Sequence, residues 1–178
     1  MYRVFKGLWL ATAIFALGGV QAAMAAEEQK VEAASAWISQ GRYFQTGATE
    51  AIFIGVMAGT LYVKDAEGRL DTADILCPGD FVIDLESGAQ EGEGKCIITD
   101  TDGENVFANW TCKGKDFLGC EGDFKLTAGT GKFEGITGGS PLKARTAFSE
   151  LVINLKSGAV VESSTGLLNL PELTYKLP

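Results

Sequence analysis

Short runs of alternating apolar and polar residues, many rich in β-branched side chains, fill residues 37–169, and glycine-containing turns separate them. Beyond the first 25 residues, no segment longer than one turn has the 3.6-residue apolar period of a helix. Turns such as Asp65–Gly68 and Asp100–Gly103 join neighbouring strands in antiparallel order, which excludes parallel βαβ units. The predicted strands lie near 37–47, 49–63, 69–77, 79–87, 92–100, 104–112, 119–128, 142–154 and 158–169.

Eight or nine antiparallel strands in about 140 residues either close into a barrel or stack as a sandwich. The run from Ile52 to Val63 is too long to stay flat, and Gly55 and Gly59 on one of its faces permit bends or bulges, as barrel corners require. The sequence therefore predicts an all-β domain over residues 37–178 and favours its closure into an antiparallel β-barrel. An immunoglobulin-like sandwich is the alternative, but its Cys-Trp-Cys spacing is missing.

Residues 1–25 have the pattern of a secretory signal peptide. Arg3 and Lys6 precede the apolar run Leu8–Val20, and Ala23–Ala25 supplies a small-x-small cleavage site. A membrane anchor in the mature protein is disfavoured, because the run has 13 residues and a spanning helix needs roughly 20. Residues 26–36 are polar and helix-tolerant, and we interpret them as a loose leader or short helix. The predicted location is periplasmic or secreted.

The composition excludes several classes of function. Cleavage after Ala25 removes two of the 15 basic residues and none of the 23 acidic ones, leaving 153 residues with a net charge of −10. Such a domain is repelled by phosphate backbones and anionic membranes, so nucleic-acid binding is disfavoured. The chain has no His, which excludes Ser/His/Asp and Cys/His triads and HExxH zinc sites. No metal and no cofactor are expected.

All four cysteines fall in the mature part of the chain, and their spacing contains no CxxC pair for a zinc ribbon. An even number in an exported chain indicates disulfides, with three possible pairings. Cys112 and Cys120 flank a seven-residue loop, so we expect them to pair and to leave Cys77 with Cys96. Each pair should then have Cα atoms within about 7 Å. A free reactive thiol is the alternative.

On this prediction, the Cys77–Cys96 disulfide needs a local bend in the chain. With a turn near residues 87–90, Cys96 stands opposite residue 80, about three residues from Cys77. A kink at Pro78–Gly79 would then have to fold Cys77 back.

Residues 122–139 form a glycine-rich segment that invites comparison with phosphate-binding loops. The GxxxxGK[ST] motif needs Ser or Thr where Phe133 stands, and GxGxxG needs glycine where Glu134 stands. No helix is indicated after the segment either. We interpret it as a tight connection between strands, with Phe124 and Phe133 packing inward.

The pattern TxGTGKFxGxxG at residues 127–138 resembles the GGTGxF segment of the allene oxide cyclase and dirigent barrels, with Ala128 in place of the first glycine. It is similar to uncharacterised bacterial exported proteins of that superfamily, which share GTGKFxGITG, CPG (here 77–79) and WxC (here 110–112). The resemblance extends over roughly residues 48–150 and implies an eight-stranded barrel with an apolar cavity. No catalytic residue is transferred, because no motif matches those of the plant enzymes.

Asp100, Asp102 and Glu104 look like the start of a calcium loop. However, Gly103 falls at position 4 of the loop rather than position 6, and no glutamate occupies position 12. A solvated hairpin turn is the better interpretation.

The first functional hypothesis is an exported barrel that binds a small apolar ligand, because the chain shows no nucleophile-and-base arrangement. Whether it is an enzyme, and its oligomeric state, are not determined by the sequence. Six aromatic residues could line a cavity or simply pack in the core: Trp37, Tyr43, Phe53, Tyr62, Phe107 and Trp110. The residues proposed to bind the ligand are Tyr43, Phe53, Tyr62 and Trp110.

Two alternatives come from other classes. An isomerase or cyclase could act by confining its substrate, with Glu50 and Tyr62 as the candidate catalytic pair. They lie an even number of residues apart on one predicted strand and so share a face, although Glu50 beside a turn could simply be solvated. A structural or protein-interaction component of the envelope is the other alternative, with the apolar run 166–173 as an interface or as the closing strand.

Overall fold

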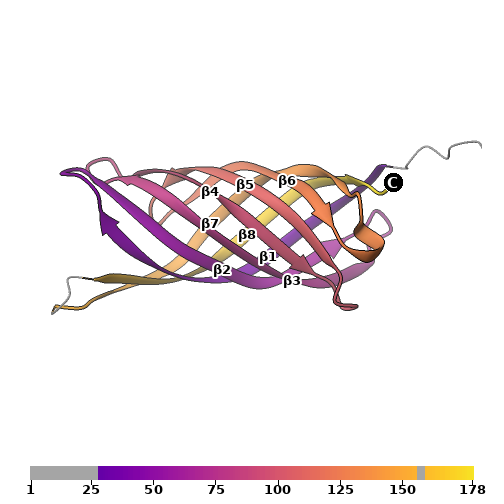
Figure 1. Cartoon of the computed structure of the whole chain (residues 1–178), viewed down its shortest axis with the longest axis horizontal. Helices are drawn as coiled ribbons and strands as arrows, with labels where there is room; N and C mark the ends of the chain where they lie inside the picture. The colour runs from indigo at the N-terminus through magenta and orange to yellow at the C-terminus, as the bar shows by residue number, and fades with distance from the viewer. Residues whose placement is uncertain (1–27, 156–158) are drawn as a thin grey trace, which may run out of the picture.

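A computed structural model of the chain describes residues 28–155 and 159–178 and contains a closed antiparallel barrel of eight strands (Figure 1). Each strand pairs with its neighbours in sequence, and β1 pairs with β8, which confirms the predicted barrel. The described part contains no helix long and apolar enough to cross a membrane. The predicted signal peptide, 1–25, lies outside the described residues. The elements are β1 (Glu28–Gln45), β2 (Glu50–Lys64), β3 (Leu70–Asp84), β4 (Ala89–Thr99), β5 (Asn105–Lys115), β6 (Gly119–Gly129), the 3₁₀ helix η1 (Gly131–Phe133), β7 (Thr137–Ile153) and β8 (Val160–Lys176).

The apolar run 166–173 is part of the closing strand. It lies within β8, which pairs with β1 on one side and with β7 on the other. Leu168, Leu170 and Leu173 face inward and are buried, whereas Leu167 is exposed. The run therefore presents no free strand edge for a partner.

The polar segment before residue 37 is a strand, so its interpretation as a leader or short helix was wrong for residues 28–36. Val31, Ala33 and Ser35 face the interior and are buried, and Glu32 between them is exposed. The segment pairs with β8 from Glu28 onward and with β2 from Glu32 onward. Its alternation is weak in the sequence because two of the three inward residues are small. The partner strands supply the apolar surface that stabilises it.

β3 is one strand where the sequence analysis predicted two. Its pairing with β2 is continuous through Pro78–Gly79. The turn between β3 and β4 occupies residues 85–88 rather than 87–90, and Leu76 pairs with Ile97 while Gly79 pairs with Gly94. In this register Cys77 stands directly opposite Cys96, so the expected kink is not needed.

Both predicted disulfides are present, and all four cysteines are bonded. The Cα atoms are 4.1 Å apart in Cys77–Cys96 and 5.5 Å apart in Cys112–Cys120. The Cys112–Cys120 bond runs diagonally between the strands, because Cys112 pairs with a glycine at 122 and Cys120 with a glycine at 114. A Cβ on the glycine at 114 would lie 2.9 Å from that of Cys120, so glycine leaves the room this bond needs.

Gly55 and Gly59 do not mark bulges, contrary to the expectation from the sequence. β2 pairs with β1 and β3 without a shift of register. Register shifts occur instead at Val31/Ala33, Phe107/Ala108, Gly139/Lys143 and Thr146/Phe148.

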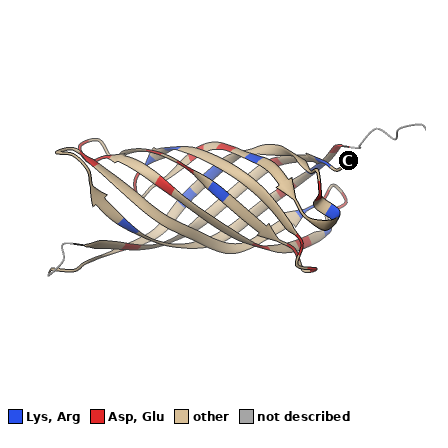
Figure 2. Cartoon of the chain, viewed as in Figure 1, with Lys and Arg blue, Asp and Glu red and all other residues tan. Residues whose placement is uncertain are grey.

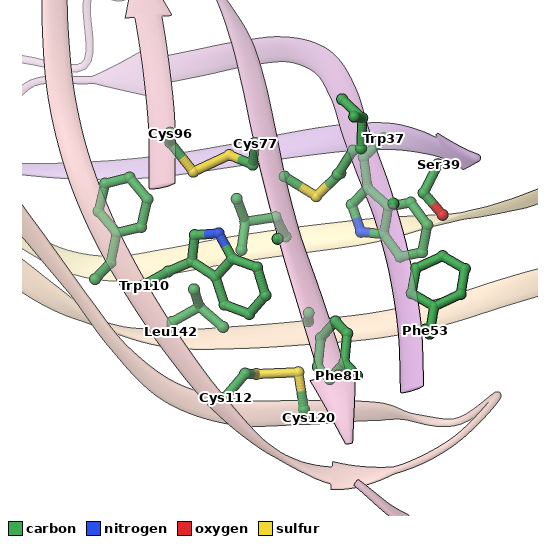
Figure 3. Close-up of a pocket in the computed structure, with 17 residues that line it drawn as sticks. Trp37, Ser39, Phe53, Cys77, Phe81, Cys96, Trp110, Cys112, Cys120 and Leu142 are labelled. Carbon is green, nitrogen blue, oxygen red and sulfur yellow. A yellow bond between two sulfur atoms is a disulfide. The ribbon is translucent and has the colours of Figure 1, made fainter. Parts of the chain in front are cut away.

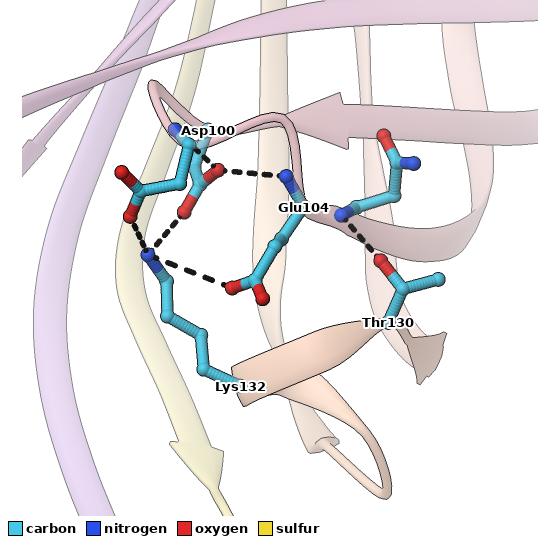
Figure 4. A network of polar contacts seen from close by, with 6 residues as sticks. Asp100, Glu104, Thr130 and Lys132 are labelled. Atoms are coloured by element: carbon cyan, nitrogen blue, oxygen red, sulfur yellow. Dashed lines mark hydrogen bonds and ion pairs between the residues drawn. The ribbon is translucent and has the colours of Figure 1, made fainter.

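The glycine-rich segment is attached to the hairpin between β4 and β5 (Figure 4). Lys132 Nζ contacts the carboxylates of Asp100, Asp102 and Glu104, at 2.6 Å from Asp102 Oδ2 and 3.7 Å from Glu104 Oε2. Hydrogen bonds from Lys132 to Asp100 and Asp102 raise the pKa of the lysine. Phe133 packs against the core. The segment is thus the tight structural connection that the sequence indicated, and the three carboxylates share a lysine.

Candidate functional site

An apolar chamber of about 120 Å³ lies inside the barrel (Figure 3). Trp110 stands at one side of it, and Trp37 with Phe53 stands at the other. Charged residues are spread along the strands and the turns (Figure 2), and Glu162 is the one charged residue that is buried in the described part of the chain. The main side chains of the chamber wall are Trp37, Phe53, Met57, Phe81, Trp110, Phe124, Leu142, Leu168 and the four disulfide cysteines.

Inward-facing glycines make the room that the aromatic rings occupy. The Trp110 ring packs on Gly79 and Gly94, which pair across β3 and β4. The Phe53 ring packs on the glycines at 41 and 55, which pair across β1 and β2 in the same way. A Cβ at any of these positions would overlap the ring. The glycines inside the strands therefore shape the chamber rather than bend the sheet.

Two hydrogen-bond donors in the chamber wall have no partner. The indole Nε1 atoms of Trp37 and Trp110 are buried, and no acceptor lies within hydrogen-bond distance among the described residues. Trp37 as a whole is only 9% exposed. A buried donor without an acceptor costs about 1–3 kcal/mol, because the group has lost its hydrogen bond to water. An acceptor on a bound molecule would recover that cost if a small shift of the indole ring or of a neighbour uncovered the N–H group, because both Nε1 atoms are fully covered.

A polar cluster adjoins one end of the chamber. It surrounds a second cavity of about 90 Å³, which shares Trp37, Ser39 and Phe53 with the chamber wall. Its members come from β1, β7, β8 and the turn after β5, so only closure of the barrel brings them together. The cluster consists of Ser39, Tyr43, Asp116, Ser149, Glu162 and Ser164.

Glu162 is at the centre of the polar cluster and is 7% exposed. The Tyr43 hydroxyl donates to Glu162 Oε2 at 2.7 Å and lies 3.1 Å from Asp116 Oδ1. Ser149 and Ser164 donate to Glu162 Oε1 at 2.9 and 2.8 Å. Neither carboxylate forms an ion pair with a Lys or Arg of the described residues.

Burial and neighbouring charge change the acidity of this cluster. Burial is the largest cause that raises the pKa of Asp116; the negative charge of Glu162 raises it further, while the hydrogen bond from Tyr43 lowers it. The pKa of Tyr43 is also raised, first by burial and then by its hydrogen bond to Glu162. A tyrosine hydroxyl has one proton to donate but lies between two carboxylates. A second proton, on Asp116, satisfies both contacts.

This arrangement predicts a specific pH dependence of stability. The pKa of Asp116 is raised on folding. Its protonated form therefore contributes fully to the free energy of unfolding below the ordinary pKa of aspartate, and this contribution is lost as pH rises through the raised pKa. We expect the free energy of unfolding of Asp116→Asn to rise relative to that of the wild type as pH increases over this interval. The measurement is urea unfolding at a series of pH values. Asp65, Asp84 and Asp100 have lowered pKa values. Their titration changes the free energy of unfolding equally in both proteins, so it cancels in the comparison. Two parallel curves would contradict the prediction.

The structure places the predicted binding residues in two groups. Phe53 and Trp110 line the chamber, and Tyr43 belongs to the polar cluster. Tyr62 is 45% exposed on the outer surface, and Phe107 lines neither the chamber nor the second cavity. Trp37, which the sequence analysis considered only as a possible lining residue, lines both.

The candidate catalytic pair Glu50 and Tyr62 does not lie in the barrel. They share a face of β2 as predicted, but that face is the outer one, because Ala51 and Phe53 occupy the inward positions. Both residues are exposed, and Glu50 lines an external groove. The acidic residues of the interior, Asp116 and Glu162, were missed. The available signal was the position of Glu162 in phase with the inward residues of its own strand.

No protein-family model matches the chain, and no curated protein matches it in sequence. Among solved structures it is similar to the pterocarpan synthase dirigent protein GePTS1, with 11% identity and a TM-score of 0.36, over 92% of this chain and 99% of that chain. The barrel fold is assigned here from the strand pairing of the chain itself.

Proposed function

We propose that the protein is an exported β-barrel that binds a small apolar molecule carrying a hydrogen-bond acceptor. The observation that carries this proposal is the pair of unpartnered indole N–H groups, Trp37 and Trp110, in the wall of an apolar chamber. Export is supported by the signal-peptide pattern of residues 1–25 and by two disulfides, which persist in oxidising compartments.

The size of the chamber sets the size of the ligand. Its volume is about 120 Å³, somewhat less than the cavity of about 150 Å³ that holds benzene. A single small ring with one carbonyl or ether oxygen is therefore the largest ligand that we propose, and it would need part of the adjoining cavity of about 90 Å³. The apolar wall favours the ring, and the indole N–H groups favour the oxygen.

The test compares two probes of nearly equal shape, cyclohexanone and methylenecyclohexane, by NMR titration. We expect cyclohexanone to bind with a Kd of roughly 0.1–1 mM, or about −4 to −5.5 kcal/mol. Because only the ketone accepts a hydrogen bond, we expect it to bind about 5- to 30-fold more tightly than the hydrocarbon, a difference of about 1–2 kcal/mol.

Variants distinguish the effect of the hydrogen bond on ligand affinity from the effect of the chamber volume. Trp37→Phe and Trp110→Phe each remove one donor and enlarge the cavity, so we expect the preference for the ketone to fall while the hydrocarbon still binds. Tyr62→Phe changes an exposed ring on the outer surface and serves as the control. Absence of binding of either probe to the wild type, or equal affinity for both, would overturn the proposal.

A further inference from the structure

We propose that Asp116 is an acid–base group that moves a proton between two carbon atoms of a ketone held in the chamber, with Tyr43 and Glu162 as its positioning residues. This inference rests on the proposed function, because the ligand must first bind. The reaction class is isomerisation of a β,γ-unsaturated ketone to its conjugated form.

The first support is the way Asp116 is held. It follows β5 in a tight turn, and Phe117, the next residue, has a φ of 60°, the one left-handed backbone angle at a non-glycine residue in the described chain. The Phe117 N–H donates to Asp116 Oδ1 at 3.2 Å, and the Tyr43 hydroxyl lies 3.1 Å from the same oxygen. No described residue donates a hydrogen bond to Oδ2 of Asp116, so one carboxylate oxygen is available to a ligand.

The second support is the surroundings of that carboxyl group. Asp116 lines the cavity of the polar cluster, whose wall shares Trp37 and Phe53 with the apolar chamber. A ligand that extends from the chamber into this cavity would thus reach the Asp116 carboxyl group and pass the unpartnered Trp37 N–H, because Trp37 lines both spaces. A proton on Asp116 is favoured by burial and by the charge of Glu162, the titratable groups facing it being Tyr43 on β1 and Glu162 on β8. An acid–base group works best when it can both hold and release its proton near the working pH.

The proposed step is balanced without an oxidant or a second substrate. The ionised Asp116 carboxylate takes the proton from the α carbon, the C–H electron pair forms a new C=C bond to the carbonyl carbon, and the carbonyl π pair moves to oxygen. The Trp37 indole N–H stabilises the resulting oxyanion. The protonated Asp116 then returns the proton to the γ carbon, the double bond shifts into conjugation, and the oxyanion reforms the carbonyl.

The experiment uses cyclohex-3-enone and follows the ultraviolet absorbance of its conjugated product, cyclohex-2-enone. We expect the folded protein to convert it about 10²- to 10⁴-fold faster than acetate at the same carboxylate concentration. Asp116→Asn should lose that acceleration while still binding cyclohexanone. Asp123→Asn changes an exposed aspartate on the outer surface of β6 and should leave the rate unchanged.

Glu162→Gln tests the positioning role. Removal of the negative charge lowers the pKa of Asp116, so the pH profile of the conversion should move to lower pH in a variant whose circular dichroism stays native. Binding of cyclohexanone without any acceleration, or full activity in Asp116→Asn, overturns the acid–base role alone. Failure of cyclohexanone to bind the wild type overturns the proposed function and this role with it.

Discussion

Replacing all four cysteines by alanine is expected to lower the free energy of unfolding by about 6 kcal/mol. The two disulfides link residues 19 and 8 positions apart. In the chain-entropy model, loops of these lengths contribute about 3.3 and 2.6 kcal/mol by restricting the unfolded chain. Because a domain is stabilised by only about 5–15 kcal/mol in total, the variant should be close to unfolding at room temperature.

The measurement is urea unfolding followed by circular dichroism. The pair Cys77→Ala/Cys96→Ala should lose somewhat more stability than the pair Cys112→Ala/Cys120→Ala, because it opens the longer loop. A reductant should destabilise the wild type to a similar degree and leave the four-alanine variant unchanged. Equal unfolding midpoints for the wild type and the four-alanine variant would refute a stabilising role of the disulfides.

Gly79→Ala is expected to destabilise the barrel by about 2–3 kcal/mol and to remove binding of cyclohexanone. The new methyl group would overlap the Trp110 ring and would lie 2.6 Å from the carbonyl oxygen of Glu93, which is backbone and cannot rotate away. Relief would therefore require Trp110 to move into the chamber and the paired backbones of β3 and β4 to shift apart locally. The expected readouts are the unfolding midpoint in urea and the near-ultraviolet circular dichroism of the tryptophans.

The control is Gly47→Ala, in the turn after β1, where the nearest atom to the new Cβ is the Glu50 Cβ at 3.4 Å. Its stability should differ little from that of the wild type. Adding Trp110→Leu to Gly79→Ala should restore part of the lost stability, because the smaller side chain no longer competes for the space. The prediction fails if the losses of stability of the two single variants simply add in the double variant, or if Gly79→Ala is as stable as the wild type. Either result would show that the packing of the Trp110 ring does not depend on Gly79.

Local pattern in the sequence was enough to predict the antiparallel barrel and both disulfides. Alternation with period two is a property of each strand by itself, and short turns determine that neighbours run antiparallel. The inward positions of Phe53 and Trp110 are consistent with the same alternation. The alternation failed for residues 28–36, where the inward residues include Ala33 and Ser35 and the apolar signal is weak.

Only the tertiary structure decided which side chains contact one another inside the barrel. The role of Gly79 depends on a ring carried by β5, two strands away in sequence order, so no local pattern indicates it. Tyr43, Asp116 and Glu162 lie on β1, after β5 and on β8, and they meet because closure and register bring them to one end of the barrel. The sequence by itself determined which residues alternate and which loops the cysteines close. Barrel closure determined which distant side chains share the interior, because pairing across strands fixes contacts between residues far apart in the chain.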